Sequence, residues 1–154
     1  HILLDLGISS YQIDHSKRGF SFQKDEPLDM RMSVDSDVIA KDILNEYDEH
    51  RLSEIFDVHG DLRNSVAIAH EIINRRVLAP LMTTTDLIDC VKKSGRYKSR
   101  SHFIATVTKC FQAIRIEVNQ EISELNHILN LKLQYLLFEK HHQSKLFQNF
   151  LLFY

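Results

Sequence analysis

The sequence predicts a mostly α-helical fold that follows one short strand and a long loop. Three observations lead to this prediction: an apolar run at residues 1–6, a stretch without periodicity at 9–36, and repeated helix signals from residue 37 onward. With 154 residues, 44% hydrophobic and 26% charged, the chain has the size and balance of one globular domain. We therefore expect helices to form most of its core.

The apolar run carries a carboxylate near its end. Residues 1–6 read His-Ile-Leu-Leu-Asp-Leu and are followed by Gly7 and two serines, a pattern typical of a buried parallel strand that ends in a functional loop. Asp5 would then lie at the carboxyl edge of a sheet, where open α/β folds bind their ligands. Its carboxylate could accept hydrogen bonds from an amine or a ribose, or it could only cap a turn.

The next segment is expected to be a long ordered loop. It contains Gly19, Pro27 and several serines and aspartates, but it also carries enough apolar side chains to argue against disorder. Gln12 and the run 18–32 mix aromatic, acidic and basic groups, which suits stacking and hydrogen bonding to a base. The same composition would also fit a loop that only packs.

Four shorter helices should precede one long helix. Asp37 caps the first, which runs to 47; Asp48 caps the second, which Gly60 stops; the third spans 62–77; and one of Thr83, Thr84 and Thr85 caps the fourth. The last helix is predicted from an apolar stripe with spacings of three and four, formed by Phe103, Val107, Phe111, Ile114, Val118, Ile122, Leu125, Leu129 and Leu133.

Charge is unevenly distributed along the chain. Overall, 19 Lys and Arg residues nearly balance 21 Asp and Glu residues, yet the stretch 90–116 holds seven basic residues and no acidic one. Such an excess around a Gly-containing loop is typical of a phosphate-contacting surface, and it also occurs on ordinary solvated faces. The basic residues are Lys92, Lys93, Arg96, Lys98, Arg100, Lys109 and Arg115.

Several chemistries find no support in the sequence. Cys90 and Cys110 are expected to be ordinary free thiols, and the pair His70-Glu71 lacks the second histidine of a zinc-protease helix, so no metal is expected. Four glycines are too few for a glycine-rich phosphate loop. No apolar stretch is long enough for a membrane span, and we expect a cytoplasmic protein without a membrane partner.

Three blocks resemble the family of bacterial 16S rRNA cytosine-N4 methyltransferases (RsmH, or MraW), in the same order. They read LLDLGISSYQID at 3–14, RGFSFQKDEPLDMRM at 18–32 and FQAIRIEVNQEISEL at 111–125. Between them, HGDLRNSVAIAHEI at 59–72 is similar to the family's Tyr-Gly-Glu-Glu-Arg helix at Gly60, Asp61 and Arg63. The chain departs from the family at Glu26, where glycine is usual, at 103–104, and throughout 130–154.

The resemblance implies an enzyme that uses S-adenosyl-L-methionine to methylate the N4 amine of a cytidine in the decoding region of 16S rRNA. It implies a Rossmann-like α/β methyltransferase fold with an inserted helical domain. Residues 1–32 would form a strand and an active-site loop of the methyltransferase domain, 33–100 the insert, and 101–154 a return helix with a divergent C-terminal segment. We expect this chain to be an internal fragment, inactive alone; the alternative is a non-catalytic helical remnant that binds RNA or another partner.

The resemblance also suggests roles for individual residues. Asp5 and Gln12 match the family's cofactor-binding positions, and the small ribosomal subunit would be the partner. A cytosine amine is a weak nucleophile, so an acceptor must orient it toward the sulfonium methyl group; either Asp29 or a backbone carbonyl of 7–10 could do so. The residues expected to face rRNA are Arg18, Arg31, Lys92, Lys93, Arg96, Lys98 and Arg100.

Overall fold

The computed structural model describes residues 17–34, 36–123, 125–130 and 132. The chain divides into two compact units, one ending at Asn119 and the other starting at Gln120. In the first unit the described residues form five helices, and in the second, residues 121–123, 125–130 and 132 are helical. The predicted strand at 1–6 with Asp5, and also Gln12, lie outside the described residues.

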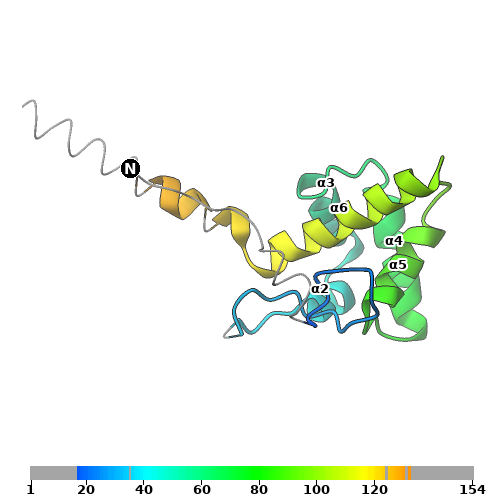
Figure 1. The fold of residues 1–154 in the computed structure, drawn as a ribbon, viewed down its shortest axis with the longest axis horizontal. Helices are drawn as coiled ribbons and strands as arrows, with labels where there is room; N and C mark the ends of the chain where they lie inside the picture. The colour runs from blue at the N-terminus through cyan, green and yellow to red at the C-terminus, as the bar shows by residue number, and fades with distance from the viewer. Residues whose placement is uncertain (1–16, 35, 124, 131, 133–154) are drawn as a thin grey trace, which may run out of the picture. The chain divides into compact units, whose positions relative to one another are not determined.

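The first unit is a bundle built around its longest helix (Figure 1). The helices are α2 (Ala40–Glu46), α3 (Glu49–Val58), α4 (Ser65–Leu78), α5 (Thr84–Lys93) and α6 (Arg100–Val118). Helix α3 packs against α4 and α6, α4 packs against α5, and α6 also contacts α2 and α5. The predicted mostly helical class is confirmed, and within the described residues the only β-type pairing is an isolated bridge between Pro27 and Thr83.

The core consists of apolar residues from all five helices and from the loop. Its fully buried members include Ile43, Leu44, Leu52, Phe56, Ile68, Ile72, Leu87 and Ile114. Each such side chain, once fully removed from water, contributes about 1.5–3 kcal/mol. Each helix therefore packs through one apolar face, whose residues recur every three or four positions, and leaves its polar face in water.

Two helix starts differ from the prediction. Helix α2 begins at Ala40 instead of directly after Asp37, two residues later than predicted, because Ile39 is its N-cap and the Ile39 N–H donates to the Asp42 carboxylate at 3.2 Å. Val38 is consequently exposed. Helix α4 begins at Ser65 instead of 62, since Leu62 belongs to the preceding turn, where its side chain is buried.

The predicted caps of α3 and α5 can be compared directly with the structure, which also shows how α6 begins. The Asp48 carboxylate accepts from the Arg51 N–H at 2.7 Å, as expected. Of the three candidate threonines, Thr83 caps α5 in a reciprocal box with Asp86. Helix α6 starts at Arg100, ahead of the predicted stripe, because the Ser99 hydroxyl accepts from the His102 N–H at 3.1 Å.

The prediction of one continuous helix from 103 to 133 is wrong. Helix α6 ends at Val118, followed by Asn119 as its C-cap, and Gln120 adopts a left-handed backbone with φ of 49°. An apolar stripe reports only which face is buried, so it cannot reveal a break at two polar residues. Leu133, the predicted last member of the stripe, lies outside the described residues.

The part of the long loop that the structure describes, 17–34 and 36, packs into the bundle, as its apolar content predicted. Leu28 and Met30 are fully buried, and the Phe22 ring meets the Phe111 ring of α6 edge-to-face at 5.6 Å. The loop also closes the start of α2, whose first two N–H groups, from Ala40 and Lys41, donate to loop carbonyls at 2.8 Å. The loop is thus a structural part of the bundle.

Replacing Gly19 by alanine should weaken this packing. Gly19 has a φ of +75°, and a Cβ there would overlap the carbonyl oxygen of Pro27. We expect Gly19→Ala to lower the free energy of unfolding by about 1–3 kcal/mol in chemical denaturation. Gly95→Ala is the matched control, because no atom lies within 4 Å of a Cβ at that position; equal stability of the two variants would contradict the account.

Candidate functional site

The loop is fastened to the start of α5 by a buried threonine. The Thr84 hydroxyl donates to the Lys24 carbonyl at 2.9 Å and accepts from the Glu26 N–H at 3.1 Å, while the Thr84 N–H donates to the Glu26 carbonyl at 2.9 Å. The Glu26 carboxylate in turn accepts from the Gly19 N–H at 3.0 Å. The glutamate that departs from the family pattern therefore closes the loop on itself.

Asp29 and Arg31 form a two-pronged ion pair at the turn of this loop. Arg31 Nε lies 2.9 Å from Asp29 Oδ1 and Nη2 lies 2.9 Å from Oδ2. Arg31 Nη1 also donates to the carbonyls of Ser36 at 2.7 Å and Val34 at 3.1 Å. Because a guanidinium holds a carboxylate in one plane, the pair fixes the backbone of residues 29–34 and the carbonyl of Ser36.

The ion pair also favours the charged form of Asp29. The hydrogen bond from Arg31 lowers the pKa of the Asp29 carboxyl, and this effect outweighs the partial burial that would raise it. The carboxyl is therefore ionised at neutral pH and can only accept hydrogen bonds. Such a group can orient an amine but cannot act as a general acid.

Arg18 connects the beginning of the described loop with its later part. Its Nη1 donates to the Arg31 carbonyl at 2.6 Å, and its guanidinium carbon lies 5.9 Å from the centre of the Phe20 ring. The Met30 N–H donates back to the Arg18 carbonyl at 2.8 Å. The guanidinium groups of Arg18 and Arg31, both predicted to face RNA, thus also hold this loop together.

Asn119 is the residue of this region that the sequence did not single out by itself. Its Oδ1 accepts from the Met32 N–H at 2.7 Å, and its Nδ2 donates to the carbonyls of Met30 and Arg115, each at 2.8 Å. One amide side chain therefore ties the loop to the end of α6. The sequence signal for this residue is the Asn119-Gln120 pair directly after an apolar stretch, since asparagine is common where a helix ends.

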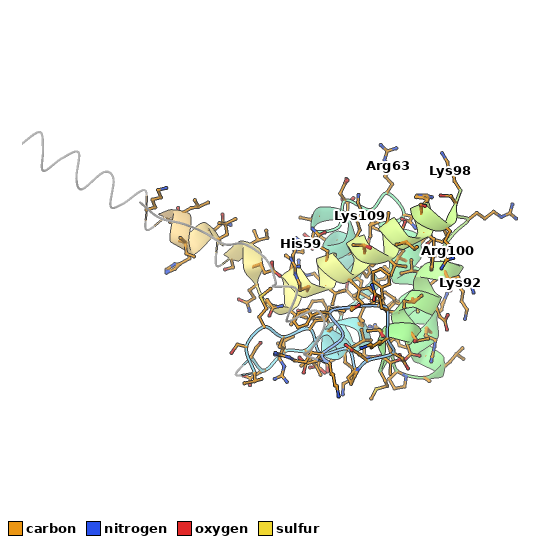
Figure 2. The ribbon with its side chains drawn as sticks, viewed as in Figure 1. His59, Arg63, Lys92, Lys98, Arg100 and Lys109 are labelled. Atoms are coloured by element: carbon orange, nitrogen blue, oxygen red, sulfur yellow. The ribbon has the colours of Figure 1, made fainter. Side chains whose placement is uncertain are left out.

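The remaining predicted site residues that the structure describes come from the end of α5, the start of α6 and the loop between them; Lys92, Lys98 and Arg100 are seen at the other end of the bundle in Figure 2. They are exposed, and within the part of the chain that the structure describes their charged groups form no hydrogen bond or ion pair. This set, called the basic end below, consists of Lys92, Lys93, Arg96, Lys98 and Arg100. Exposed cations without intramolecular partners are typical of surfaces that bind nucleic acid.

A tyrosine fixes the loop that carries two of these cations. The Tyr97 hydroxyl donates to the Val91 carbonyl and lies 3.1 Å from the Ser94 hydroxyl. The Tyr97 ring packs edge-to-face against Phe103 at 5.0 Å. Arg96 and Lys98, on either side of it, are therefore presented from a backbone that is anchored to both α5 and α6.

The structure separates the predicted site residues into two groups. Arg18, Asp29 and Arg31 lie beside Asn119, at the carboxyl end of α6, whereas Lys98 and Arg100 lie at its amino end. The helix has 19 residues, which corresponds to about 27 Å along its axis. Helix α5 is shorter, with 10 residues; it contacts the loop through Thr84 at its start and carries Lys92 in its last turn.

The other candidates are structurally ordinary. Both cysteines are free and buried, and burial raises the pKa of Cys90 to about 11 and that of Cys110 to about 12, so neither is a nucleophile at neutral pH. His70 lies 3.4 Å from Glu49 as a surface pair. Among the described residues no group could hold a metal ion, and no described helix is both long and apolar enough to cross a membrane.

Comparison with known proteins identifies the family. The model of the MraW methylase family matches residues 1–141. Ribosomal RNA small subunit methyltransferase H of Chloroherpeton thalassium is 48% identical over 128 residues, which cover 83% of this chain and 40% of that protein. The protein of the same name from Fervidobacterium nodosum is 42% identical over 139 residues, covering 88% of this chain and 45% of that protein.

These matches decide what class of protein the bundle belongs to. A fixed loop with an ionised acceptor at one end and unpaired cations at the other is a helical module suited to polyanion binding. The chain belongs to the MraW methylase family, and this confirms the resemblance found in the three sequence blocks. It spans less than half the length of the relatives it matches.

Replacing Arg31 by lysine should show whether the charge of Arg31 or its two hydrogen bonds lowers the pKa of Asp29. Lysine keeps the positive charge but cannot hold both carboxylate oxygens, so we expect the pKa of Asp29 to rise toward its ordinary value in an NMR titration of the carboxyl carbon. A pKa that is lowered on folding adds stability above the unfolded-state pKa, and this is lost as pH falls through the folded-state pKa; the variant should therefore lose less stability on acidification.

Asp25 provides the internal control for this titration. Hydrogen bonds from Thr83 and Thr85 lower its pKa, and Arg31 is not among the causes. The titration midpoint of Asp25 should therefore be the same in Arg31→Lys and in the unmodified protein. An unchanged Asp29 midpoint in Arg31→Lys would contradict the assigned role of the pair.

Proposed function

We propose that the protein methylates the N4 amine of a cytidine in 16S rRNA, using S-adenosyl-L-methionine as the methyl donor. The observation that carries the proposal is the match of residues 1–141 to the MraW methylase family, together with relatives that bear the name ribosomal RNA small subunit methyltransferase H. In this proposal residues 1–32 contribute a strand and the active-site loop, 33–100 the inserted helical domain, and 101–154 the return segment. The proposed place of action is the cytoplasm.

The cofactor would be bound by residues at the start of the chain. S-Adenosyl-L-methionine supplies an electrophilic methyl group on a sulfonium, and the family resemblance assigns Asp5 and Gln12 to its binding. A carboxylate and an amide are suitable partners for the hydroxyl and amino groups of such a molecule. Both residues lie outside the described part of the structure, so their role rests on the sequence.

Asp29 is the proposed acceptor that orients the target amine. A carboxylate offers about four lone-pair sites, and the described residues use three of them, through Arg31 Nε, Nη2 and the Arg31 backbone N–H at 3.0 Å. One site on Oδ2 is left for an incoming donor, and the side chain is 20% exposed. A backbone carbonyl of 7–10 is the alternative acceptor for the same amine.

The basic end is the proposed binding surface for the RNA backbone. Arg100 stands in the first turn of α6, where the helix dipole disfavours a cation and where no acidic residue compensates. Its position is therefore not explained by the stability of the helix. Contacts to phosphates would use these cations and release counterions from the RNA; Arg18 and Arg31 would add contacts only through groups left over from their role in the loop.

A methyl-transfer assay tests the proposal. The full-length protein, given methyl-labelled cofactor and purified small ribosomal subunits, should produce N4-methylcytidine in the digested 16S rRNA, detected by mass spectrometry. Label on another nucleoside, or no label in RNA, would overturn it. RNA binding without any transfer would favour the alternative of a non-catalytic RNA-binding module.

Removing two cations from the basic end should reduce this activity. We expect Lys92→Gln with Lys98→Gln to lower kcat/KM for the subunits by about tenfold, through loss of phosphate contacts, and to leave cofactor binding unchanged. The matched control is Lys41→Gln with Lys132→Gln, which removes the same charge from residues outside the basic end. Equal effects of the two double variants would rule out a specific role for the basic end.

A further inference from the structure

We propose that Arg63, in the turn between α3 and α4, binds a phosphate of the RNA and extends the basic end along α6. The inference rests on the proposed function and assigns an additional contact to it. The matched motif Gly60-Asp61-Leu62-Arg63 has no place in the site described so far. Three features of this turn carry the proposal: its fixed position, the pairing of its acidic residue and its location beside α6.

The turn is held firmly on α6. A Cβ at Gly60 would lie 2.7 Å from the carbonyl oxygen of Phe56 in α3, which is closer than a side chain allows, and 3.2 Å from the carbonyl oxygen of Lys109 in α6, so the turn lies tightly against both helices. Leu62 is buried with 4% exposure. Arg63 therefore projects from an anchored backbone.

The acidic residue of the turn is already engaged by a different cation. Lys109 Nζ lies 3.0 Å from Asp61 Oδ2 and 3.1 Å from the Asp61 carbonyl oxygen. The hydrogen bond from Lys109 also lowers the pKa of the Asp61 carboxyl. Arg63 is left exposed, and among the described residues its guanidinium makes no hydrogen bond or ion pair.

The position of the turn continues the basic end. Lys109, which touches the turn, follows Arg100 by nine residues in α6, which corresponds to about 14 Å along the helix axis. In Figure 2 the side chains of Arg63 and Lys98 extend away from the ribbon in the same direction. A guanidinium suits a phosphate because its planar fork matches two phosphate oxygens.

The salt dependence of RNA binding tests the inference. The full-length protein is titrated with a 16S rRNA transcript over a range of salt concentrations. Each lost phosphate contact reduces the slope of log K against log salt by about 0.7–0.9, so Arg63→Gln should flatten the slope by that amount and weaken binding severalfold. Arg63→Lys should restore the slope, since it keeps the charge.

Lys41→Gln is the single-charge control, because Lys41 lies on α2, outside the basic end. It should leave both slope and affinity at the values of the unmodified protein. An Arg63→Gln variant with unchanged slope and affinity overturns the inference. Methyl transfer to small subunits by the unmodified protein is measured in parallel. Absence of this transfer would refute the proposed function. If transfer is present and Arg63→Gln binds RNA with unchanged slope and affinity, only the role of Arg63 is refuted.

Discussion

The structure depends on the burial of a segment that has no regular secondary structure. Leu28 and Met30 are inside the bundle, so the backbone polar groups around them must find partners away from water. Each of these groups has a separate partner. The Leu28 N–H donates to the Met82 carbonyl at 3.1 Å, and the Leu28 carbonyl accepts from the Lys41 N–H of α2. The Met30 carbonyl accepts from the side-chain amide of Asn119. The loop and the helices therefore need each other to fold.

The same requirement gives the candidate site its geometry. The groups that satisfy the loop are at the start of α5 and at the end of α6, and both helices carry cations at their opposite ends. The basic end is thereby connected to the loop by both helices: α5 through Thr84, which binds Lys24 and Glu26, and α6 through Asn119, which binds Met30 and Met32. In the proposed function the cations at the basic end contact phosphates, and Asp29 in the loop orients the target amine.

Sequence reasoning was accurate where one local signal decides the structure. Apolar periodicity gave the buried faces of α3 and α5, and Asp48 was correctly identified as a cap. It failed where long-range contacts matter: periodicity extended the last helix past Asn119, whose amide binds the backbone of Met30 and Met32 in the loop. Periodicity contains no information about such partners, which lie up to 89 residues apart.

Hydrogen exchange of the full-length protein, with and without 16S rRNA, tests the central claim most directly. The claim is that the RNA backbone binds the basic end and the turn before α4. Bound RNA should slow amide exchange in 92–101 and 60–64 and leave 77–83 unchanged, although Leu78 is 84% exposed there and equally accessible to a partner. Slowed exchange confined to 77–83, or unchanged exchange at 92–101, would contradict the account.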